Sequence, residues 1–416
     1  MANIIEKWTQ SSLILKIVIG MIIGTILGIF FPKWTAIGLL GTLFVSALKA
    51  IAPILVFVLV TSAISKAKTG IGSRFKTVIY LYFFSTFFAA LVAIIGSYLF
   101  PVSIPLSNVA GASVAAPEGL YEIISNMLLK IFENPLHSLV EGDYLSILFW
   151  SIVIGAALNR VANDTTKDVL SDIADAITKV VWSIIQFAPI GILGLVFTSV
   201  SQSGIGIFTQ YGELILVLVG CIAFVMFIVN PLLTGITLKR NPYPLVYTCL
   251  KESGLTAFFS RSSAANIPVN MNLCERLGLD KDFYSISIPL GSTINTGGAA
   301  ITITVMSLAV CHTLGIQVAL PLTLILCLIS ILGACGASGI AGGSLLLVPM
   351  ACSLFGISND IAMQAVAVGF IIGVIQDSCE TALNSSGDAL FSATAEYRDR
   401  AKNGEPVNYL GEFAKD

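Results

Sequence analysis

Charged residues are scarce in this chain of 416 residues, of which lysine, arginine, aspartate and glutamate make up only 11%. A soluble protein carries about a quarter. Hydrophobic residues account for 56%, and the mean hydropathy is +0.91. This composition excludes an ordinary soluble domain and predicts a polytopic helical membrane protein. No basic patch indicates nucleic acid as a partner.

Histidine and paired cysteine are also nearly absent. The two histidines, His137 and His312, have no ligand spacing around them, and the eight cysteines are scattered without a CxxC motif. These patterns argue against a catalytic or metal-binding histidine, and the cysteines are expected to pack as small hydrophobic residues. No small-residue cleavage site precedes the first apolar segment, so we expect a retained first helix and not a removed signal peptide.

Long apolar runs that reach or approach membrane-spanning length occupy much of the first 240 residues. They lie at 13–31, 37–64, 77–100, 144–158, 173–200 and 212–238. The stretch 101–121 is rich in Pro, Ser, Ala and Gly and is expected to be a loop. Basic residues gather in alternate connections, so the positive-inside rule predicts that both termini are cytoplasmic.

Two later apolar segments are too short for two spans and are broken in the middle. SRSSAANIP interrupts residues 244–274, which have basic residues on both sides, and GACGASGIAGG interrupts residues 321–355, which have none. Each segment is predicted to enter the membrane and turn back, from opposite faces. Each precedes a helix with a polar interruption, at 295–298 and 384–387, which makes an inverted repeat. The predicted fold is an all-α polytopic membrane protein with eight transmembrane helices plus two re-entrant helical hairpins.

The last apolar segment, residues 361–391, carries three acids and an amide: Asp377, Glu380, Asn384 and Asp388. Their offsets of three, seven and eleven residues place them within an arc of roughly 80° on a helix. Each intramembrane ionisable group costs about 2.5–3.5 kcal/mol, which favours function over packing alone. Oxygen ligands in a row suit a hard monovalent cation and the ammonium group of an amino acid.

The first hairpin tip supplies Ser262 and Ser263, hydroxyls beside a helix N-terminus that suits a carboxylate. The glycines of the second tip leave carbonyls free for a cation, or serve close helix packing alone.

In the seventh span, Gly291 and residues 295–298 are expected to unwind the helix. With Asn384 and Asp388, the freed carbonyls would complete an all-oxygen cage. In the first span, Gly20, Gly24 and Gly28 are expected to form a helix-packing ridge.

Four motifs follow one another along the chain: an SRSS tip, an N-x-x-G break, a Gly-rich tip and D-x-x-E-T-x-x-N-x-x-x-D. Their order resembles that of the dicarboxylate/amino acid:cation symporter family. This family includes the glutamate transporters and the archaeal aspartate transporter. The resemblance covers nearly the whole chain and is most specific from 253 to 390. SRSSAANIPVN and QDSCETALNSS are most similar to the family's bacterial sodium-coupled serine/threonine branch. The resemblance implies a homotrimer in a bacterial inner membrane, with a transport domain that moves as an elevator.

The resemblance also implies the site residues. Substrate would bind at Arg261, Ser262, Ser263, Ile340, Gly343, Asp377, Glu380, Thr381 and Asn384, with Asp377 on the ammonium group. One sodium ion would bind at Gly291, Asn295, Asn384 and Asp388. A second sodium ion would bind at Thr293, Ala334, Cys335 and Ala337.

The implied division of the chain has three parts. The scaffold would comprise helices 1 and 2 (1–75) and a loop with helices 4 and 5 (101–210). The transport domain would comprise spans 3 and 6 (76–100 and 211–240), the hairpins (241–275 and 321–356) and spans 7 and 8 (283–313 and 361–391). A cytoplasmic tail would follow at 392–416.

Glu380 departs from the family's acidic-substrate members, which carry an arginine there that pairs with the substrate's side-chain carboxylate. A glutamate would repel an anion. It can instead accept a hydrogen bond from a hydroxyl, or be held by Arg261. We therefore expect a small neutral hydroxyl amino acid, serine or threonine, as substrate.

Gly297 is a second departure, because more elaborate members carry an aspartate there that completes a third ion site. Tyr82, Ser85 and Thr86 match the other ligands of that site. Without the carboxylate, we expect the third site to be absent or weak.

The sequence thus favours a sodium:amino-acid symporter and no enzyme. Proton coupling through Asp377, Glu380 and Asp388 stays open as an alternative. So does a passive channel, since glycine-rich re-entrant loops also build filters. An intramembrane hydrolase lacks a histidine or lysine base on the core elements.

Overall fold

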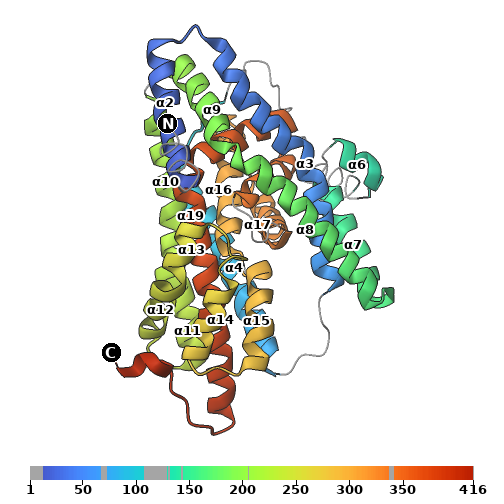
Figure 1. Cartoon of the computed structure of the whole chain (residues 1–416), viewed down its shortest axis with the longest axis vertical. Helices are drawn as coiled ribbons and strands as arrows, with labels where there is room; N and C mark the ends of the chain where they lie inside the picture. The colour runs from blue at the N-terminus through green and yellow to red at the C-terminus, as the bar shows by residue number, and fades with distance from the viewer. Residues whose placement is uncertain are drawn as a thin grey trace, which may run out of the picture.

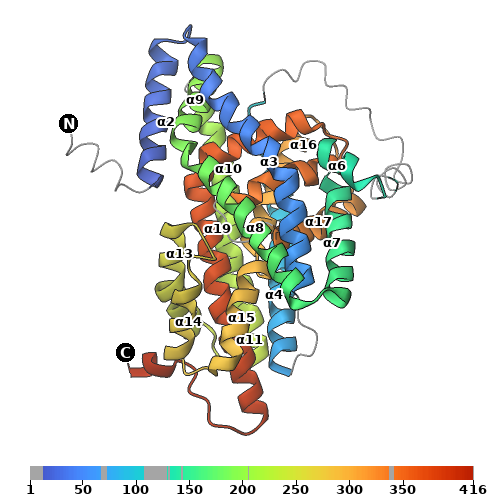
Figure 2. The same cartoon turned by 45° about the vertical axis from the view of Figure 1, so that its right-hand side comes forward.

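Two groups of helices make up the described part of the chain (Figures 1 and 2). Every regular element in this part is helical, in agreement with the predicted class. The computed structural model describes residues 13–66, 73–106, 129, 132–141, 144–204, 206–336 and 342–415.

The first group consists of helices that pack mainly on one another. They are α2 (Leu13–Phe30), α3 (Gly38–Ser65), α7 (Tyr144–Val161), α8 (Asp164–Gln186) and α9 (Ala188–Ser203), with the short η1 (Thr35–Ile37) and α6 (Pro135–Glu141). In Figure 1, α2, α9 and the start of α3 lie at the end of the molecule away from the C-terminus.

Glycines bring α2 and α9 into close contact. A Cβ atom on Gly20 would lie 2.3 Å from the carbonyl oxygen of Pro189. One on Gly24 would lie 2.5 Å from the carbonyl oxygen of Leu193, and one on Gly28 would lie 3.0 Å from that of Phe197. Because these residues recur every four positions, they form one ridge along α2. The predicted packing ridge is confirmed.

The second group is an elongated bundle. It contains α4 (Ser73–Leu99), α10 (Ile207–Phe224), η2 (Val225–Val229), α11 (Asn230–Leu238), α15 (Lys281–Ile294), α16 (Gly297–Thr313) and α19 (Asn359–Lys402). Helix α16 is buried along nearly its whole length, from Gly297 to Cys311. It packs on α4 and α19 and is the centre of this bundle.

Two broken segments flank α19. The first comprises α12 (Tyr243–Cys249), η3 (Leu250–Gly254), α13 (Leu255–Ser260) and α14 (Ile267–Arg276). The chain reverses between α13 and α14, because α14 packs back on η3 and Asn266 Nδ2 donates to Ser253 Oγ at 3.0 Å. Figure 2 shows this hairpin beside α19.

The second broken segment comprises α17 (Leu320–Gly336), η4 (Gly343–Leu347) and α18 (Val348–Ser353). Both η4 and α18 pack on α17, so this segment also folds back. Residues 337–341 lie outside the described ranges, and with them the predicted site residues Ala337 and Ile340.

The helix breaks agree with the expectations only in part. The seventh span is unwound at Asn295 and Thr296, as expected, but the unwinding expected at Gly291, Gly297 and Gly298 is wrong, because they lie within α15 and α16. Helix α19 runs through 384–387 without a break, and Ser386 Oγ donates to the Ala382 carbonyl within it. The run 173–200 is divided at Phe187, because Pro189 in the first turn of α9 cannot continue the hydrogen bonding of α8.

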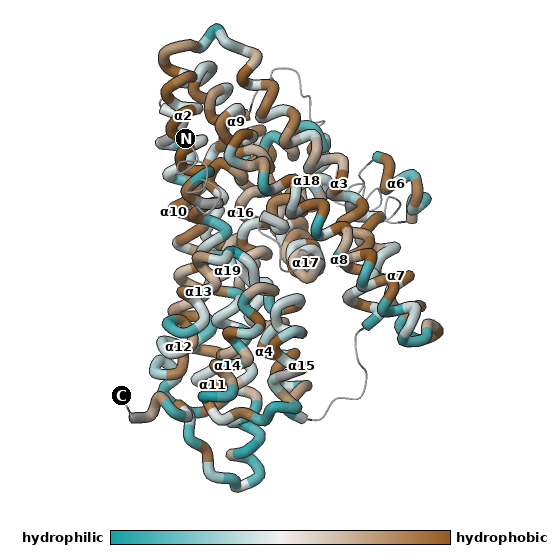
Figure 3. The backbone as a smooth tube through the Cα atoms, in the orientation of Figure 1, coloured by the Kyte–Doolittle hydropathy of each residue, from teal (hydrophilic) through white to brown (hydrophobic). Residues whose placement is uncertain are grey.

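The described helices include four stretches that are long and apolar enough to cross a membrane. They are Ser73–Leu99, Thr209–Leu238, Lys281–Thr313 and Asn359–Lys402. Shorter apolar helices accompany them, including α9 and α17. Figure 3 shows hydrophobic residues through most of the length of the molecule and hydrophilic residues gathered at the end that carries the C-terminus.

Ionic contacts at that hydrophilic end join α4, α15 and α19. Asp280 is the N-cap of α15 and accepts a hydrogen bond from Asp282 N–H at 3.0 Å. Arg74 of α4 donates to the Asp280 carboxylate at 2.9 Å, and the Asp280 N–H donates to Glu396 of α19 at 2.9 Å. The hydrogen bond from Arg74 holds the pKa of the Asp280 carboxyl below its usual range.

The glycine ridge gives a first prediction. Gly24→Ala should lower the apparent unfolding temperature by a few degrees, because overpacking costs about 1–3 kcal/mol and outweighs the helix propensity gained, about 1 kcal/mol. Gly212→Ala is the matched control, since a Cβ atom there meets nothing within 4 Å. Thermal unfolding in detergent measures both. Equal unfolding temperatures for the two variants would contradict the close packing of α2 on α9.

Candidate functional site

The polar face of α19 lies where that helix meets both broken segments and the start of α16. Asp377, Glu380, Asn384 and Asp388 are all buried, with exposed fractions of 2%, 7%, 7% and 0%. Their predicted spacing along one helix is confirmed, since α19 is continuous through all four. Each carboxylate therefore has to find its partners inside the protein.

Asp377 is paired with Arg261 of the first hairpin. Arg261 Nε donates to Asp377 Oδ2 at 2.8 Å, and both side chains are buried. Arg261 directly follows α13 and has a left-handed backbone, with φ of 53°. The backbone of Gly342, just before η4, also lies near Asp377. Asp377 thus joins the two hairpin tips.

Glu380 is held by neutral donors. Thr302 Oγ1, Gln376 Nε2 and Ser344 Oγ donate to its Oε2 atom at 2.7, 2.5 and 2.9 Å. They belong to α16, α19 and η4, respectively. Arg261, which was one expected partner of Glu380, instead pairs with Asp377.

Asp388 lies in a cluster of oxygen atoms around the break between α15 and α16. Asn295 Nδ2 donates to Asp388 Oδ1 and to the Asn384 carbonyl, each at 2.9 Å. The second carboxylate oxygen, Oδ2, is buried and makes no hydrogen bond within the described part of the chain. A Cβ atom on Gly291 would lie 2.8 Å from Asp388 Oδ1. Gly291 therefore serves close approach of the α15 backbone to this carboxylate.

Asn384 connects this cluster to α16. Its Oδ1 atom accepts from the Gly298 N–H in the first turn of α16 at 2.8 Å. A Cβ atom on Gly298 would lie 2.8 Å from Glu380 Cγ, so only glycine lets α16 approach α19 this closely. Asn295, Asn384, Asp388 and Gly291, the four residues predicted for one sodium ion, lie together.

The remaining predicted residues lie around these groups. Ser263 is buried in the turn of the first hairpin, and Ser262 Oγ accepts from the Ala265 N–H there. Thr381 Oγ1 donates to the Asp377 carbonyl, and Gly343 begins η4.

The residues predicted for the second ion site lie at two helix ends. Thr293 Oγ1 donates to the Leu290 carbonyl near the end of α15. Cys335 Sγ lies 4.0 Å from the Ile294 carbonyl oxygen, and Ala334 is buried beside it in α17. The end of α17 is therefore brought to the end of α15.

Gln376, Thr302 and Ser344 were not identified from the sequence. Gln376 lies four residues before Glu380, so helical spacing alone places it on the same face. Thr302 and Ser344 come from other elements, and no local pattern connects either with Glu380. The anchor of the first hairpin was also missed: Asn266 and Asn270 donate to Ser385 Oγ at 2.8 and 3.0 Å.

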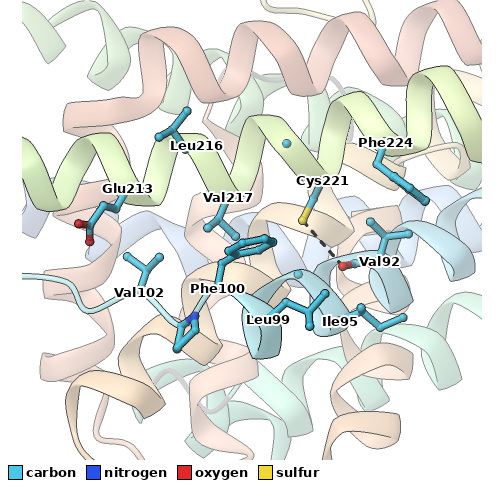
Figure 4. Close-up of a pocket in the computed structure, with 13 residues that line it drawn as sticks. Val92, Ile95, Leu99, Phe100, Val102, Glu213, Leu216, Val217, Cys221 and Phe224 are labelled. Atoms are coloured by element: carbon cyan, nitrogen blue, oxygen red, sulfur yellow. Dashed lines mark hydrogen bonds between the residues drawn. The ribbon is translucent and has the colours of Figure 1, made fainter.

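A large cavity lies away from these residues. It has a volume of about 870 Å³ and lies between α4 and α10 (Figure 4). Its lining is apolar except at a few atoms, and Glu213 is the one charged residue among the residues that line it. A zwitterion needs both an anionic and a cationic or amide partner, so this cavity is unsuited to an amino acid.

The buried ion pair gives a second prediction. Arg261→Gln should lower the apparent unfolding temperature, because an unpaired buried charge costs roughly 3 kcal/mol or more. Adding Asp377→Asn should restore much of the loss, since no buried charge then stays unpaired. The unfolding temperatures of the two single variants and the double variant measure the coupling. Additive effects would mean that the pair does not stabilise the hairpin tip.

Comparison with known proteins agrees with this geometry. The model of the sodium:dicarboxylate symporter family matches residues 13–397. The serine/threonine transporter SstT of Bifidobacterium adolescentis is 56% identical over 405 residues, which cover 97% of this chain and 94% of the relative. The proteins of the same name from Streptococcus agalactiae and Streptococcus thermophilus are 57% and 55% identical over 396 residues, which cover 95% of this chain and 98% of each relative.

The family match spans the first group of helices, both hairpins and the polar face of α19. With its membrane-length apolar helices, the chain is a multi-pass membrane protein and a transporter. It belongs to the sodium:dicarboxylate symporter family.

Proposed function

We propose that this protein is a sodium-coupled symporter that imports serine and threonine across the bacterial inner membrane. One observation carries the proposal: three buried acids on one face of α19 meet both hairpins and the break between α15 and α16. Relatives at 55–57% identity that are named serine/threonine transporters support the substrate class.

The amino acid is proposed to bind between the hairpin tips. Asp377 would take the ammonium group, in exchange for Arg261. Asn384 and the backbone around Ser263 and Ile340, the last of which lies outside the described residues, would take the α-carboxylate. Glu380 would accept the side-chain hydroxyl, which is supported by the hydroxyl groups that it already binds.

Sodium is proposed as the second substrate. The unpartnered Oδ2 atom of Asp388, in a cluster with Asn295, Asn384 and the Gly291 backbone, supplies the charge and oxygen atoms that a hard cation requires. A second ion is proposed between Thr293 and the end of α17. Binding of either ion would change the affinity for the amino acid, and binding of the amino acid would change the affinity for that ion by the same factor.

The predicted third ion site is proposed to be absent. Ser85 Oγ donates to Asn230 Oδ1 at 2.7 Å, which supports a neutral hydrogen bond at this position in place of an ion. Gly297 offers no side chain, and a Cβ atom there would already lie 3.2 Å from that of Ala89.

The two helix groups are proposed to be the two bodies of an elevator. Helices α2, α3, α7, α8 and α9 would form the scaffold of a homotrimer, and the bundle with both hairpins would carry the substrates. Support comes from the packing, which is dense within each group and sparse between them. Both termini are proposed to be cytoplasmic.

The central test is Asp388→Asn, which keeps the shape of the side chain and removes its charge. We expect sodium-driven uptake of labelled serine by proteoliposomes to be lost, or to need roughly tenfold more sodium or above, because a hydrogen bond or ligand to a charged group is worth about 1.5–3 kcal/mol. Asp360→Asn, in the first turn of the same helix, is the control. Undiminished accumulation by Asp388→Asn would overturn sodium coupling at this site, and sodium-free uptake at acid pH would favour proton coupling.

The proposed substrate choice is tested at Glu380. Glu380→Arg should abolish the preference for serine and relieve the rejection of aspartate and glutamate, because the repulsive charge becomes attractive. Competition of labelled serine uptake by the common amino acids measures both effects. Glu380→Gln, which keeps the size, should weaken serine uptake without admitting acidic substrates. An unchanged competition profile for Glu380→Arg would remove Glu380 from the substrate site.

A further inference from the structure

The Oε2 atom of Glu380 already has three hydrogen-bond donors. An ionised carboxylate has about four lone-pair sites, two on each oxygen, so three donors leave no free site on Oε2. A substrate hydroxyl that binds this atom has to replace one of them. The gain in affinity from a substrate hydroxyl on Oε2 therefore depends on which donor leaves that atom.

Two of the three donors are fixed by the helices that carry them. Thr302 is fully buried in α16, and its hydroxyl also accepts from Gln376 Nε2 at 2.7 Å. Gln376 lies in α19 one turn before Glu380, so these two groups hold each other as well as the carboxylate.

Ser344 differs from them in its position. It lies in the five-residue 3₁₀ helix η4, directly after Gly342 and Gly343. Gly342 has φ of 73°, in the left-handed region that favours glycine, and its backbone contacts Asp377. Short 3₁₀ segments have poorer hydrogen-bond geometry than α-helices. Ser344 is therefore the donor that can move away at the least cost.

Ser344 also carries the same chemical group as the proposed substrates, an aliphatic hydroxyl on Cβ. We propose that Ser344 is a specificity-determining residue whose hydroxyl exchanges with the substrate hydroxyl on Glu380. Serine or threonine displaces the Ser344 hydroxyl, whereas alanine leaves it in place. This inference rests on the proposed function, because it requires a hydroxyl amino acid between Asp377 and Glu380.

The exchange has a consequence for affinity. Serine gains one hydrogen bond to Glu380 and Ser344 loses one, so the net gain over alanine is small in the natural protein. When Ser344 has no hydroxyl, serine takes the third position on Oε2 without displacing a donor. A buried hydrogen bond is worth about 0.5–1.5 kcal/mol, which corresponds to roughly a two- to tenfold change in affinity.

Equilibrium binding in saturating sodium tests the exchange. Purified wild type and Ser344→Ala are titrated with labelled L-serine, and unlabelled L-threonine and L-alanine are added as competitors. We expect Ser344→Ala to bind serine and threonine roughly two- to tenfold more tightly and to leave the constant for alanine unchanged. Ser307→Ala is the matched control, because Ser307 is also fully buried but donates to Ile303 in its own helix. It should leave all constants unchanged.

Other outcomes separate this inference from the proposed function. Weaker or unchanged serine binding by Ser344→Ala would overturn the exchange, since the hydroxyl would then contact substrate directly or play no part. If wild type binds neither serine nor threonine, the proposed function itself fails. Ser344→Gly removes the same hydroxyl and gives the same test if the alanine variant does not fold.

Discussion

Burial of carboxylates along α19 is the constraint on which the rest of the bundle depends. A buried acid has to find a partner inside the protein, and the structure meets this need in three different ways. Asp377 has an arginine, Glu380 has three neutral donors, and Asp388 has an asparagine on one oxygen only. Each arrangement needs a group from outside α19, so the hairpins and the broken seventh span have to converge on this helix.

The glycines of this region follow from the same constraint. Gly291 and Gly298 are helical, and each removes a Cβ atom that would collide with an acidic residue of α19. Backbone amides and carbonyls thereby reach side chains that a larger residue would hold apart. The polar break is correspondingly short, with only Asn295 and Thr296 between two helices. Close approach, more than unwinding, brings the oxygen atoms together.

The sequence predicted those parts of the fold and site that depend on local pattern. Hydropathy and helical spacing identified the acids of α19, and the interrupted apolar segments identified both reversals of the chain. Contacts between residues far apart in the sequence could not be predicted from local pattern. Nothing in the local sequence connects Ser344 or Thr302 with Glu380, or decides whether Arg261 pairs with Glu380 or Asp377. The continuity of α19 through 384–387 agrees with the predicted helical spacing of the acids, and the serines there bond within the helix or to a neighbouring segment, as Ser386 and Ser385 do.

The left-handed backbone of Arg261 places conformational strain at the first hairpin tip. A non-glycine residue in this region costs about 1–2 kcal/mol, and the side chain of the same residue forms the buried ion pair with Asp377. An ammonium group bound at Asp377, as proposed, would compete with Arg261 for this carboxylate. Arg261 would then lose its buried partner while it keeps a left-handed backbone. Occupancy of one carboxylate and the conformation of the segment that precedes α14 would therefore be coupled.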